Sequence, residues 1–360
     1  MKAKDKDKAK EQLIKNRKAQ KGCGLEMKKT VSIVAVAVTV VASGMVTGCA
    51  GVDKPVVPLE KVTIGISATS LLPALVHIAD EKGYFLDEGI DAEIRGYPAG
   101  KFALAALFDG ELDMATVGET PIVTNSFERD DFAVFVTILD SAQHAKALTR
   151  KDRDINTPED LIGKKVATTI GTTAHFCMAT FFTLHGLDTA DVEIVDMKPG
   201  EMVEAIANGD VDAIFAWEPN ILEAQEILGD NAIVLPSALG YRATFNLVSK
   251  NDFHENNPEL ITKIIRTLAK AQEFTESNRQ ESIAIMASRL ETDTEDIAKI
   301  WDIYRFRLSL SQSLIVALEN AARWAIANNM TDKTAVPNYL DFIYLDGLEA
   351  VSPEGVTIIH

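Results

Sequence analysis

The chain has 360 residues, 47% of them hydrophobic and 25% charged, which excludes a disordered chain, a fibrous repeat and a polytopic membrane protein. It is long enough for one large or two medium domains. Residues 49–360 carry 25 basic against 49 acidic side chains, a net charge of −24. Because phosphate contacts need clustered cations, so acidic a body excludes a nucleic-acid binder.

The N-terminus predicts an export signal followed by a lipidated cysteine. Residues 31–46 are almost all apolar or small and uncharged, but they are fewer than the ~20 that a membrane-spanning helix prefers. Val46-Thr47-Gly48-Cys49 then resembles a bacterial lipobox, in which Cys49 is diacylated and becomes the mature N-terminus. The alternative is a signal-anchor helix with a chance cysteine. We expect residues 1–48 to form a basic extension and a signal peptide, with translation starting at either Met1 or Met27, and residues 49–59 to form a tether.

Beyond the tether, strand and helix signals alternate along the chain. Strands are predicted at 62–66, 112–117, 132–139, 165–170, 192–195, 211–216 and 244–249, where short apolar runs occur. Helices are predicted at 70–82, 101–108 and from Thr157, and then at 258–277, 294–306 and 311–328 in an almost entirely helical end of the chain. This βα alternation is typical of parallel, doubly wound sheets.

Two landmarks recur in the same order in the two halves of this region. A strand runs into Gly65, and another into Gly171, before the serines or threonines that begin a helix. A later strand leads into Gly118-Glu119-Thr120-Pro121, and its counterpart leads into Trp217-Glu218-Pro219. Each landmark alone is generic to α/β proteins. Together they favour two similar lobes with a cleft between them over one continuous sheet.

All four landmarks lie where ligands of open α/β sheets bind, beyond the carboxyl ends of strands. The Gly171-Thr172-Thr173-Ala174-His175 turn offers backbone N–H groups, two hydroxyls and an imidazole to an oxyanion, without any lysine or arginine. The alternative is that Thr172 or Thr173 only caps a helix. Trp217 could place its flat indole against a ligand, and Glu218 could bind a cationic group of the ligand. The alternative is that the indole only packs in the core and that the glutamate only lies in the first turn of a helix.

Catalytic and metal-binding motifs are missing from the sequence. The 6 histidines have no metal-binding spacing, and 3 cysteines exclude a disulfide scaffold and a multi-cysteine metal site. There is no Gly-x-Ser-x-Gly elbow, no phosphate-loop lysine motif and no dinucleotide fingerprint. Cys177 lies just inside an apolar helix start, where a nucleophile is conceivable, but a buried apolar filler is the simpler interpretation.

Ordered motifs make the chain similar to a known family. They are Glu81-Lys82-Gly83-Tyr84-Phe85, Glu88-Gly89-Ile90, Gly110-Glu111-Leu112-Asp113, Gly118-Glu119-Thr120-Pro121, Leu161-Ile162-Gly163-Lys164-Lys165-Val166-Ala167, Gly171-Thr172-Thr173-Ala174-His175, Val211-Asp212-Ala213 and Trp217-Glu218-Pro219. Between Val62 and Ser249 the chain thus resembles the nitrate, sulfonate and taurine substrate-binding proteins of ABC importers, the NMT1-like family. The resemblance implies a type II periplasmic-binding-protein fold. We expect lobe 1 at 60–145, lobe 2 at 146–243, and a return strand with C-terminal helices at 244–360, packed mainly on lobe 1.

The resemblance also implies a function without catalysis. We expect an extracytoplasmic, lipid-anchored monomer that captures a small anionic or zwitterionic ligand for a permease and its ATPase, with no cofactor and no metal. The predicted ligand-binding residues are Thr69, Ser70, Glu119, Thr120, Gly171, Thr172, Thr173, His175, Trp217 and Glu218. If Glu218 faces the cleft ionised, the ligand should carry a compensating cation, as taurine does, with Trp217 beside it.

Two departures from the family pattern leave the ligand open. Glu119 is longer than the family's usual residue, and the loop 67–70 lacks the usual glutamine or aromatic residue. Nitrate, sulfonate, taurine, bicarbonate and a pyrimidine-like ligand all remain candidates. Thiamine-pyrimidine synthases are similar in fold but have a cysteine-rich cluster, against which the single Cys177 of the mature chain argues. An extracytoplasmic sensor is a third possibility.

Overall fold

The computed structural model of the protein describes residues 58–236 and 242–359. The predicted signal peptide and the lipobox with Cys49 lie outside the described residues, and so does almost all of the predicted tether. Among the residues that are described, no helix is both long and apolar enough to cross a membrane.

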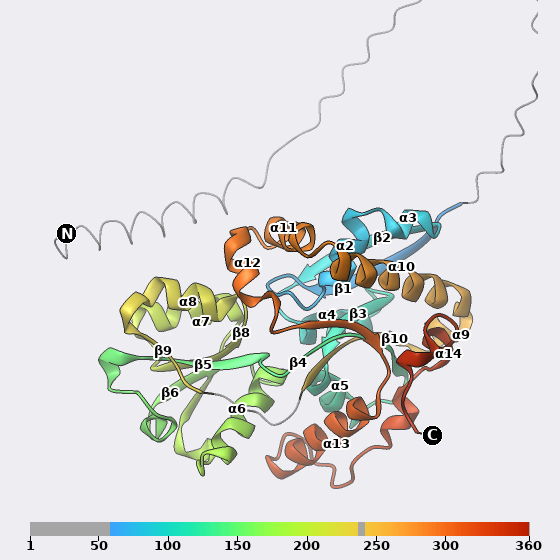
Figure 1. Ribbon diagram of the computed structural model, residues 1–360. Helices are drawn as coiled ribbons and strands as arrows, with labels where there is room; N and C mark the ends of the chain where they lie inside the picture. The colour runs from blue at the N-terminus through green and yellow to red at the C-terminus, as the bar shows by residue number, and fades with distance from the viewer. Residues whose placement is uncertain (1–57, 237–241, 360) are drawn as a thin grey trace, which may run out of the picture. The chain divides into compact units, whose positions relative to one another are not determined.

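Two mixed β-sheets form the framework (Figure 1). The first contains β1 (Glu60–Ser67), β2 (Ile90–Tyr97), β3 (Met114–Gly118), β4 (Phe132–Ser141), β10 (Ala243–Lys250) and β11 (Arg305–Ser309). The second contains β5 (Ala145–Arg150), β6 (Lys165–Thr168), β7 (Glu193–Asp196), β8 (Ala213–Trp217) and β9 (Ala232–Val234). The strand orders are β11-β4-β10-β3-β1-β2 and β7-β6-β8-β5-β9.

The two sheets share one arrangement of strands. β1 pairs in parallel with β2 and β3, just as β6 pairs in parallel with β7 and β8. Each sheet also contains one strand that the chain enters directly after leaving the other sheet. This strand is antiparallel to its neighbour: β10 pairs with β3 in the first sheet, and β5 pairs with β8 in the second. The structure therefore confirms the predicted fold class of two similar α/β lobes. We call the first sheet with its helices lobe 1 and the second sheet with its helices lobe 2.

Helices cover both faces of each sheet. They are α2 (Ala74–Glu81), α3 (Tyr84–Asp87), α4 (Gly100–Phe108), α5 (Glu119–Ser126), α6 (Thr173–Leu184), α7 (Pro199–Asn208), α8 (Asn220–Leu228), α9 (Asn251–Asn256), α10 (Pro258–Ser277), α11 (Arg279–Arg289), α12 (Thr294–Trp301), α13 (Gln312–Ala327) and α14 (Asp346–Glu349). Figure 1 shows α2 and α10 on one face of the first sheet, with α5 and α13 on the other. In the second sheet, α7 and α8 lie opposite α6.

The helix predicted at 294–306 is wrong beyond Trp301. The chain turns there, and Arg305–Ser309 forms β11 on the edge of the first sheet, antiparallel to β4. Arg305 donates two hydrogen bonds to the carboxylate of Asp140 on β4, at 2.6 and 2.9 Å. This long-range pairing overrides the local helix signal.

The other differences are smaller. The helix predicted from Ser70 begins only at Ala74, because the Ser70 hydroxyl accepts from Leu72 N in a preceding turn and Pro73 occupies the cap position. The helix predicted from Thr157 is a single 3₁₀ turn, Pro158–Leu161, that has the expected capping box. Strands β2, β5 and β9 were not predicted.

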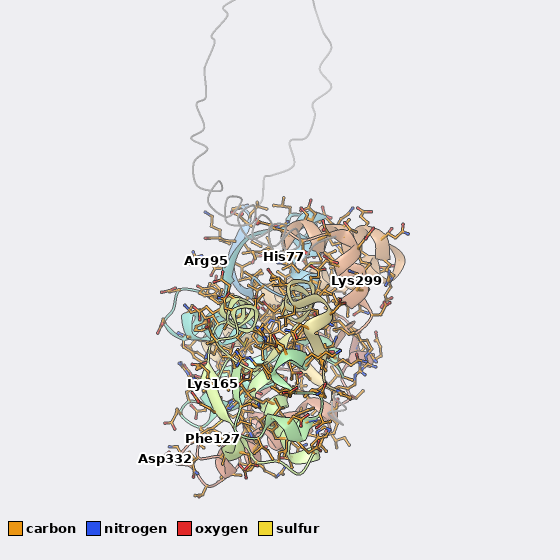
Figure 2. The ribbon with its side chains drawn as sticks, turned by 90° about the vertical axis from the view of Figure 1, so that its left-hand side faces the viewer. His77, Arg95, Phe127, Lys165, Lys299 and Asp332 are labelled. Carbon is orange, nitrogen blue, oxygen red and sulfur yellow. The ribbon has the colours of Figure 1, made fainter. Side chains whose placement is uncertain are left out.

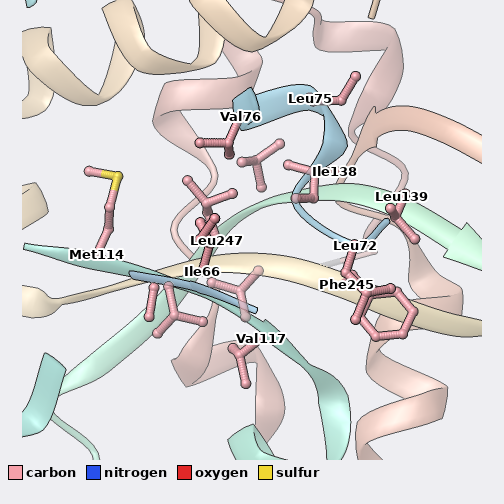
Figure 3. Packing of buried hydrophobic residues seen from close by; sticks show 14 of the residues in the cluster. Ile66, Leu72, Leu75, Val76, Met114, Val117, Ile138, Leu139, Phe245 and Leu247 are labelled. Carbon is pink, nitrogen blue, oxygen red and sulfur yellow. The ribbon is translucent and has the colours of Figure 1, made fainter. Parts of the chain in front are cut away.

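The largest hydrophobic core joins the first sheet to the C-terminal helices. Figure 3 shows part of it, where residues from β1, β3, β4 and β10 pack against Leu75 and Val76 of α2. Leu268 of α10 and Leu318 of α13 belong to the same cluster and are fully buried. Because residues 57–360 form one compact unit by their contacts, the lobe boundaries at 60–145, 146–243 and 244–360 remain a proposal.

Candidate functional site

A cavity that is partly open to solvent lies between the two sheets. Lobe 1 contributes Ser67, Leu72, Ala99, Gly100, Lys101, Thr116, Val117, Gly118, Pro121 and Phe245 to its lining. The other side contributes Thr172, Thr173 and Trp217 of lobe 2, and His144 of the crossover that enters it. The structure thus brings residues from all four predicted landmarks to one cavity, since β1, β3 and β8 end there and α6 begins there.

Four lining side chains each bury a polar atom that has no hydrogen-bond partner among the described residues. These atoms are Thr116 Oγ1, His144 Nδ1, Thr173 Oγ1 and Trp217 Nε1. Buried polar groups are usually bonded, because leaving one unsatisfied costs about 1–3 kcal/mol. Hydroxyls donate or accept, whereas an indole N–H can only donate. Their convergence on one cavity indicates a binding site for a ligand that carries hydrogen-bond acceptors.

His144 and Trp217 form an aromatic wall of the cavity. Their rings are stacked, with centroids 5.9 Å apart and planes 13° apart, and Phe245 lies 4.5 Å from the imidazole. Burial lowers the pKa of His144 to about 3. The imidazole is therefore neutral at physiological pH, and it offers a ligand hydrogen bonding and stacking but no charge.

Burial lowers the pKa of four histidines, His77, His144, His175 and His254, and three of them with large shifts make the stability of the protein depend on pH. Burial lowers the pKa of His144 to about 3 and those of His77 and His175 to about 4, all below the ordinary 6.5. The unfolded chain therefore binds more protons than the folded chain between pH 6.5 and pH 4. Stability contributed by the neutral histidines is complete above pH 6.5 and is lost as the pH falls, by roughly 1.4 kcal/mol per pH unit for each histidine.

We expect the free energy of unfolding, measured with urea, to be several kcal/mol lower at pH 5 than at pH 7. His77→Gln provides the control, because His77 lies on α2, outside the cavity lining (Figure 2). In this variant the free energy of unfolding should depend less steeply on pH, by the contribution of one histidine. Equal stability at pH 5 and pH 7 would contradict the assignment of the three histidines as neutral.

The turn that begins α6 only partly reaches the cavity. Thr172 is the N-cap residue of α6 and donates its hydroxyl to the carbonyl of Thr169 at 2.7 Å, while Thr173 is a lining residue whose Oγ1 has no partner among the described residues. Gly171 has a φ of +76°, a left-handed conformation that favours glycine, and is outside the lining. His175 is outside it too, because its Nδ1 accepts from Gly171 N at 3.4 Å and its ring packs edge-on against Trp324 at 5.0 Å.

Four other predicted residues lie outside the lining. The Ser70 hydroxyl donates to Ser67, which lines the cavity, at 3.1 Å, and the Thr69 hydroxyl donates to a backbone carbonyl at 3.2 Å. Glu119 and Thr120 begin α5 and are fully buried. Glu119 Oε2 accepts from the backbone N–H of Thr244 at 3.1 Å, so this carboxylate is bound by the protein itself.

Glu218 also lies outside the lining, and it is paired. Its Oε1 is 2.8 Å from Lys146 Nζ, and its Oε2 accepts from Leu222 N in the first turn of α8 at 2.9 Å. The Glu218 side chain is only 2% exposed. Because a lysine and a helix N-terminus compensate this charge, the cavity needs no cationic ligand to balance it.

Of the predicted ligand-binding residues only Thr172, Thr173 and Trp217 are in the lining, and the lining residues that were not predicted include two basic side chains, Lys101 and His144. Lys101 is the only charged side chain among the described residues that line the cavity. It lies in the first turn of α4, directly after β2 ends, so the rule about carboxyl ends of strands could have found it. His144 lies in the crossover between β4 and β5, and no local pattern marks it. Within residues 58–236 and 242–359, no three histidine, cysteine or carboxylate side chains gather in a way that could hold a metal ion.

The fold is that of periplasmic binding proteins. The alkanesulfonate-binding protein SsuA from Xanthomonas axonopodis pv. citri, bound to MOPS, superposes with a TM-score of 0.71 at 18% identity, over 80% of this chain and 99% of that one. The desulfurization enzyme DSZB superposes with a TM-score of 0.60 at 14% identity, over 81% of this chain and 98% of that one. At such identities these likenesses show the fold alone.

The chain belongs to the NMT1/THI5-like family, whose model matches residues 73–282, more than half of its length. The taurine-binding periplasmic protein of Escherichia coli (strain K12) is 28% identical over 208 residues, which are 57% of this chain and 63% of that protein. A putative aliphatic sulfonates-binding protein of Bacillus subtilis (strain 168) is 28% identical over 280 residues, 76% of this chain and 80% of that protein. The match to the taurine-binding protein thus spans less than two thirds of that relative.

Proposed function

We propose that the protein is the solute-binding component of an ABC importer and captures a small organic oxyanion, of which a sulfonate is the best candidate. The observation that carries the proposal is the group of four polar atoms, unpartnered among the described residues, around one cavity between two lobes. Relatives named as taurine-binding and aliphatic sulfonates-binding proteins support the same class of ligand.

The lining favours an anion whose remaining part is uncharged. Lys101 supplies a cation, and none of the described lining residues is an aspartate or a glutamate. Leu72, Val117 and Phe245 offer apolar surface for a carbon chain. Since Lys146 already pairs with Glu218, the ammonium of taurine would find no carboxylate partner in the described lining. We therefore favour an alkanesulfonate without an amine over taurine.

A thermal-shift and calorimetric comparison of the full chain with two matched ligands tests this proposal. Propane-1-sulfonate and taurine have the same length and differ in a methyl against an ammonium group. We expect propane-1-sulfonate to bind more tightly, and at 100 times its Kd to add about 2.7 kcal/mol of stability. Tighter binding of taurine would contradict the amine-free ligand. Binding of neither sulfonate, with binding of nitrate, bicarbonate or a pyrimidine, would contradict the sulfonate class.

We propose no covalent chemistry for this cavity. Its described lining contains no cysteine and no carboxylate, so its hydroxyls and the His144 imidazole have no acidic partner there. Cys177 is fully buried in the core of lobe 2.

The proposal extends to the cellular setting. A lipid at Cys49 would keep the protein outside the cytoplasmic membrane, as a monomer that passes its ligand to a permease and an ATPase. The periplasmic binding proteins among its relatives support the extracytoplasmic location, and the lipobox in the sequence supports the anchor.

A further inference from the structure

Lys101 lies where the two lobes meet at the cavity. It belongs to α4 of lobe 1, yet its Nζ donates a hydrogen bond to the backbone carbonyl of Ile170, 2.7 Å away in lobe 2. Ile170 directly precedes the Gly171 turn from which Thr172 and Thr173 reach the cavity. One side chain therefore both lines the cavity and bridges the two lobes.

Lys101 forms no ion pair among the described residues, although Asp196 accepts from the backbone N–H of Ile170 at 2.9 Å and so lies in the neighbourhood of the ammonium. No carboxylate among the described residues lies within 4.0 Å of its Nζ, and the Ile170 carbonyl is a neutral acceptor. The Phe102 ring, 5.0 Å from the ammonium, carries no charge either. An ammonium has three N–H donors, of which the carbonyl uses one, so the group can also donate to an anion in the cavity.

Because the rest of the molecule is strongly acidic, an anionic ligand depends on the positive charge of Lys101 for binding. Residues 49–360 carry a net charge of −24. Salt screens that field beyond about 8 Å at physiological ionic strength, so capture of an anion depends on charges at close range. Lys101 is the only such charge in the part of the lining that the structure describes, because His144 is neutral.

We propose that Lys101 selects an anionic over a neutral ligand and couples its capture to closure of the lobes through the bond to Ile170. The inference rests on the proposed function and identifies Lys101 as the residue that distinguishes a charged from a neutral ligand. An anion beside the ammonium and the Thr173 hydroxyl would contact both lobes at once, and the Lys101–Ile170 bond would hold the lobes in that position.

The test compares propane-1-sulfonate with neutral propane-1-sulfonamide on the full chain and three variants. Lys101→Met keeps the length of the side chain but removes its charge, and Lys101→Arg keeps the charge. Lys165→Met is the control, because Lys165 begins β6 in lobe 2, is half-exposed and lies outside the lining (Figure 2). We expect Lys101→Met to weaken the sulfonate at least tenfold and the sulfonamide less than threefold. Lys165→Met should stay within threefold of the wild-type Kd for the sulfonate, and Lys101→Arg should lose less sulfonate affinity than Lys101→Met because it keeps the charge.

A second measurement reports on closure. Small-angle scattering should show that saturating propane-1-sulfonate compacts the wild type but compacts Lys101→Met less. Unchanged sulfonate affinity in Lys101→Met, or equal affinity of the wild type for both ligands, would overturn the role in charge selection. Equal compaction of both proteins would overturn the coupling to closure. If the wild type binds neither ligand, the proposed sulfonate function itself fails. If Lys101→Met does not fold, a loss of affinity in folded Lys101→Gln supports the inference, and wild-type affinity overturns it.

Discussion

Replacing Lys146 by methionine is expected to lower the free energy of unfolding by about 3–5 kcal/mol, because it leaves a buried carboxylate without its cation. Lys146 Nζ lies 2.8 Å from Glu218, whose side chain is 2% exposed. Leu222 N would remain as a hydrogen-bond donor to Glu218, but a single backbone N–H does not replace an ammonium. Urea unfolding at pH 7 measures the effect.

The paired variant tells the buried charge apart from lost packing. Lys146→Met with Glu218→Gln removes both charges, so we expect it to recover most of the stability that Lys146→Met loses. Lys165→Met is again the surface control, because its partner Glu193 is 62% exposed and such pairs contribute about 0–1 kcal/mol. Equal losses in the single and the double variant would show that the uncompensated charge of Glu218 does not cause the loss.

The Lys146–Glu218 pair also explains how the aromatic wall of the cavity is held. In the register of β5 and β8, Ala145 lies opposite Trp217. His144 directly precedes Ala145, and Glu218 directly follows Trp217. The ion pair therefore ties the two strand ends that carry the stacked rings. The pair also lies near lobe 1, since burial, followed by the charge of Glu218, raises the pKa of Tyr304 well above its ordinary value.

Local sequence patterns were sufficient to predict the fold class and to predict at which edge of the sheets the cavity lies. Apolar runs and glycines mark β1, β3, β6 and β8 because buried parallel strands need such residues locally. The place of the cavity follows from topology alone, because parallel strands in one sheet end at the same edge. Ser67, Gly118, Thr173 and Trp217 could all be placed there from the sequence.

The partners of individual side chains could not be predicted in this way. Glu218 meets Lys146 across 72 positions of the chain, and Lys101 meets the Ile170 carbonyl across 69. Nothing in the residues around Glu218 distinguishes a carboxylate that faces a ligand from one that faces a lysine. β11 was missed for the same reason, because its partner strand β4 is distant in the sequence.

The C-terminal helices do more than complete the core of lobe 1. Trp324 of α13 packs against His175 at 5.0 Å and against Phe176 at 5.2 Å, both at the start of α6 in lobe 2. Phe176 is counted in the core cluster of lobe 1, although the following turns of α6 pack within lobe 2. Helix α13 thus holds in place the turn that brings Thr172 and Thr173 to the cavity.

Gly118→Ala is expected to weaken binding of the ligand about tenfold to a hundredfold. A methyl group on Gly118 of lobe 1 would collide with Thr173 Oγ1 of lobe 2 and come within 3.3 Å of the Phe245 ring. The backbone of Gly118 has a φ of −75°, so alanine fits the local conformation and only the contact between the lobes is disturbed. Overpacking of this kind costs about 1–3 kcal/mol. Calorimetric titration with propane-1-sulfonate measures the loss.

A double-mutant cycle with Thr173→Ala assigns the loss to this contact. Thr173→Ala alone should weaken an anion by about 1.5–3 kcal/mol, since it removes a hydrogen bond to a charge. In that background Gly118→Ala should cost less than threefold more, because the collision with Oγ1 is gone and the new methyl group meets the Cβ atom at position 173 at an ordinary 3.5 Å, which leaves only the 3.3 Å approach to Phe245. Gly200→Ala is the matched control, because no described atom lies within 4 Å of its added methyl group. If Gly118→Ala costs as much in the Thr173→Ala background as in the wild type, the two lobes do not meet at Gly118 in the ligand-bound protein.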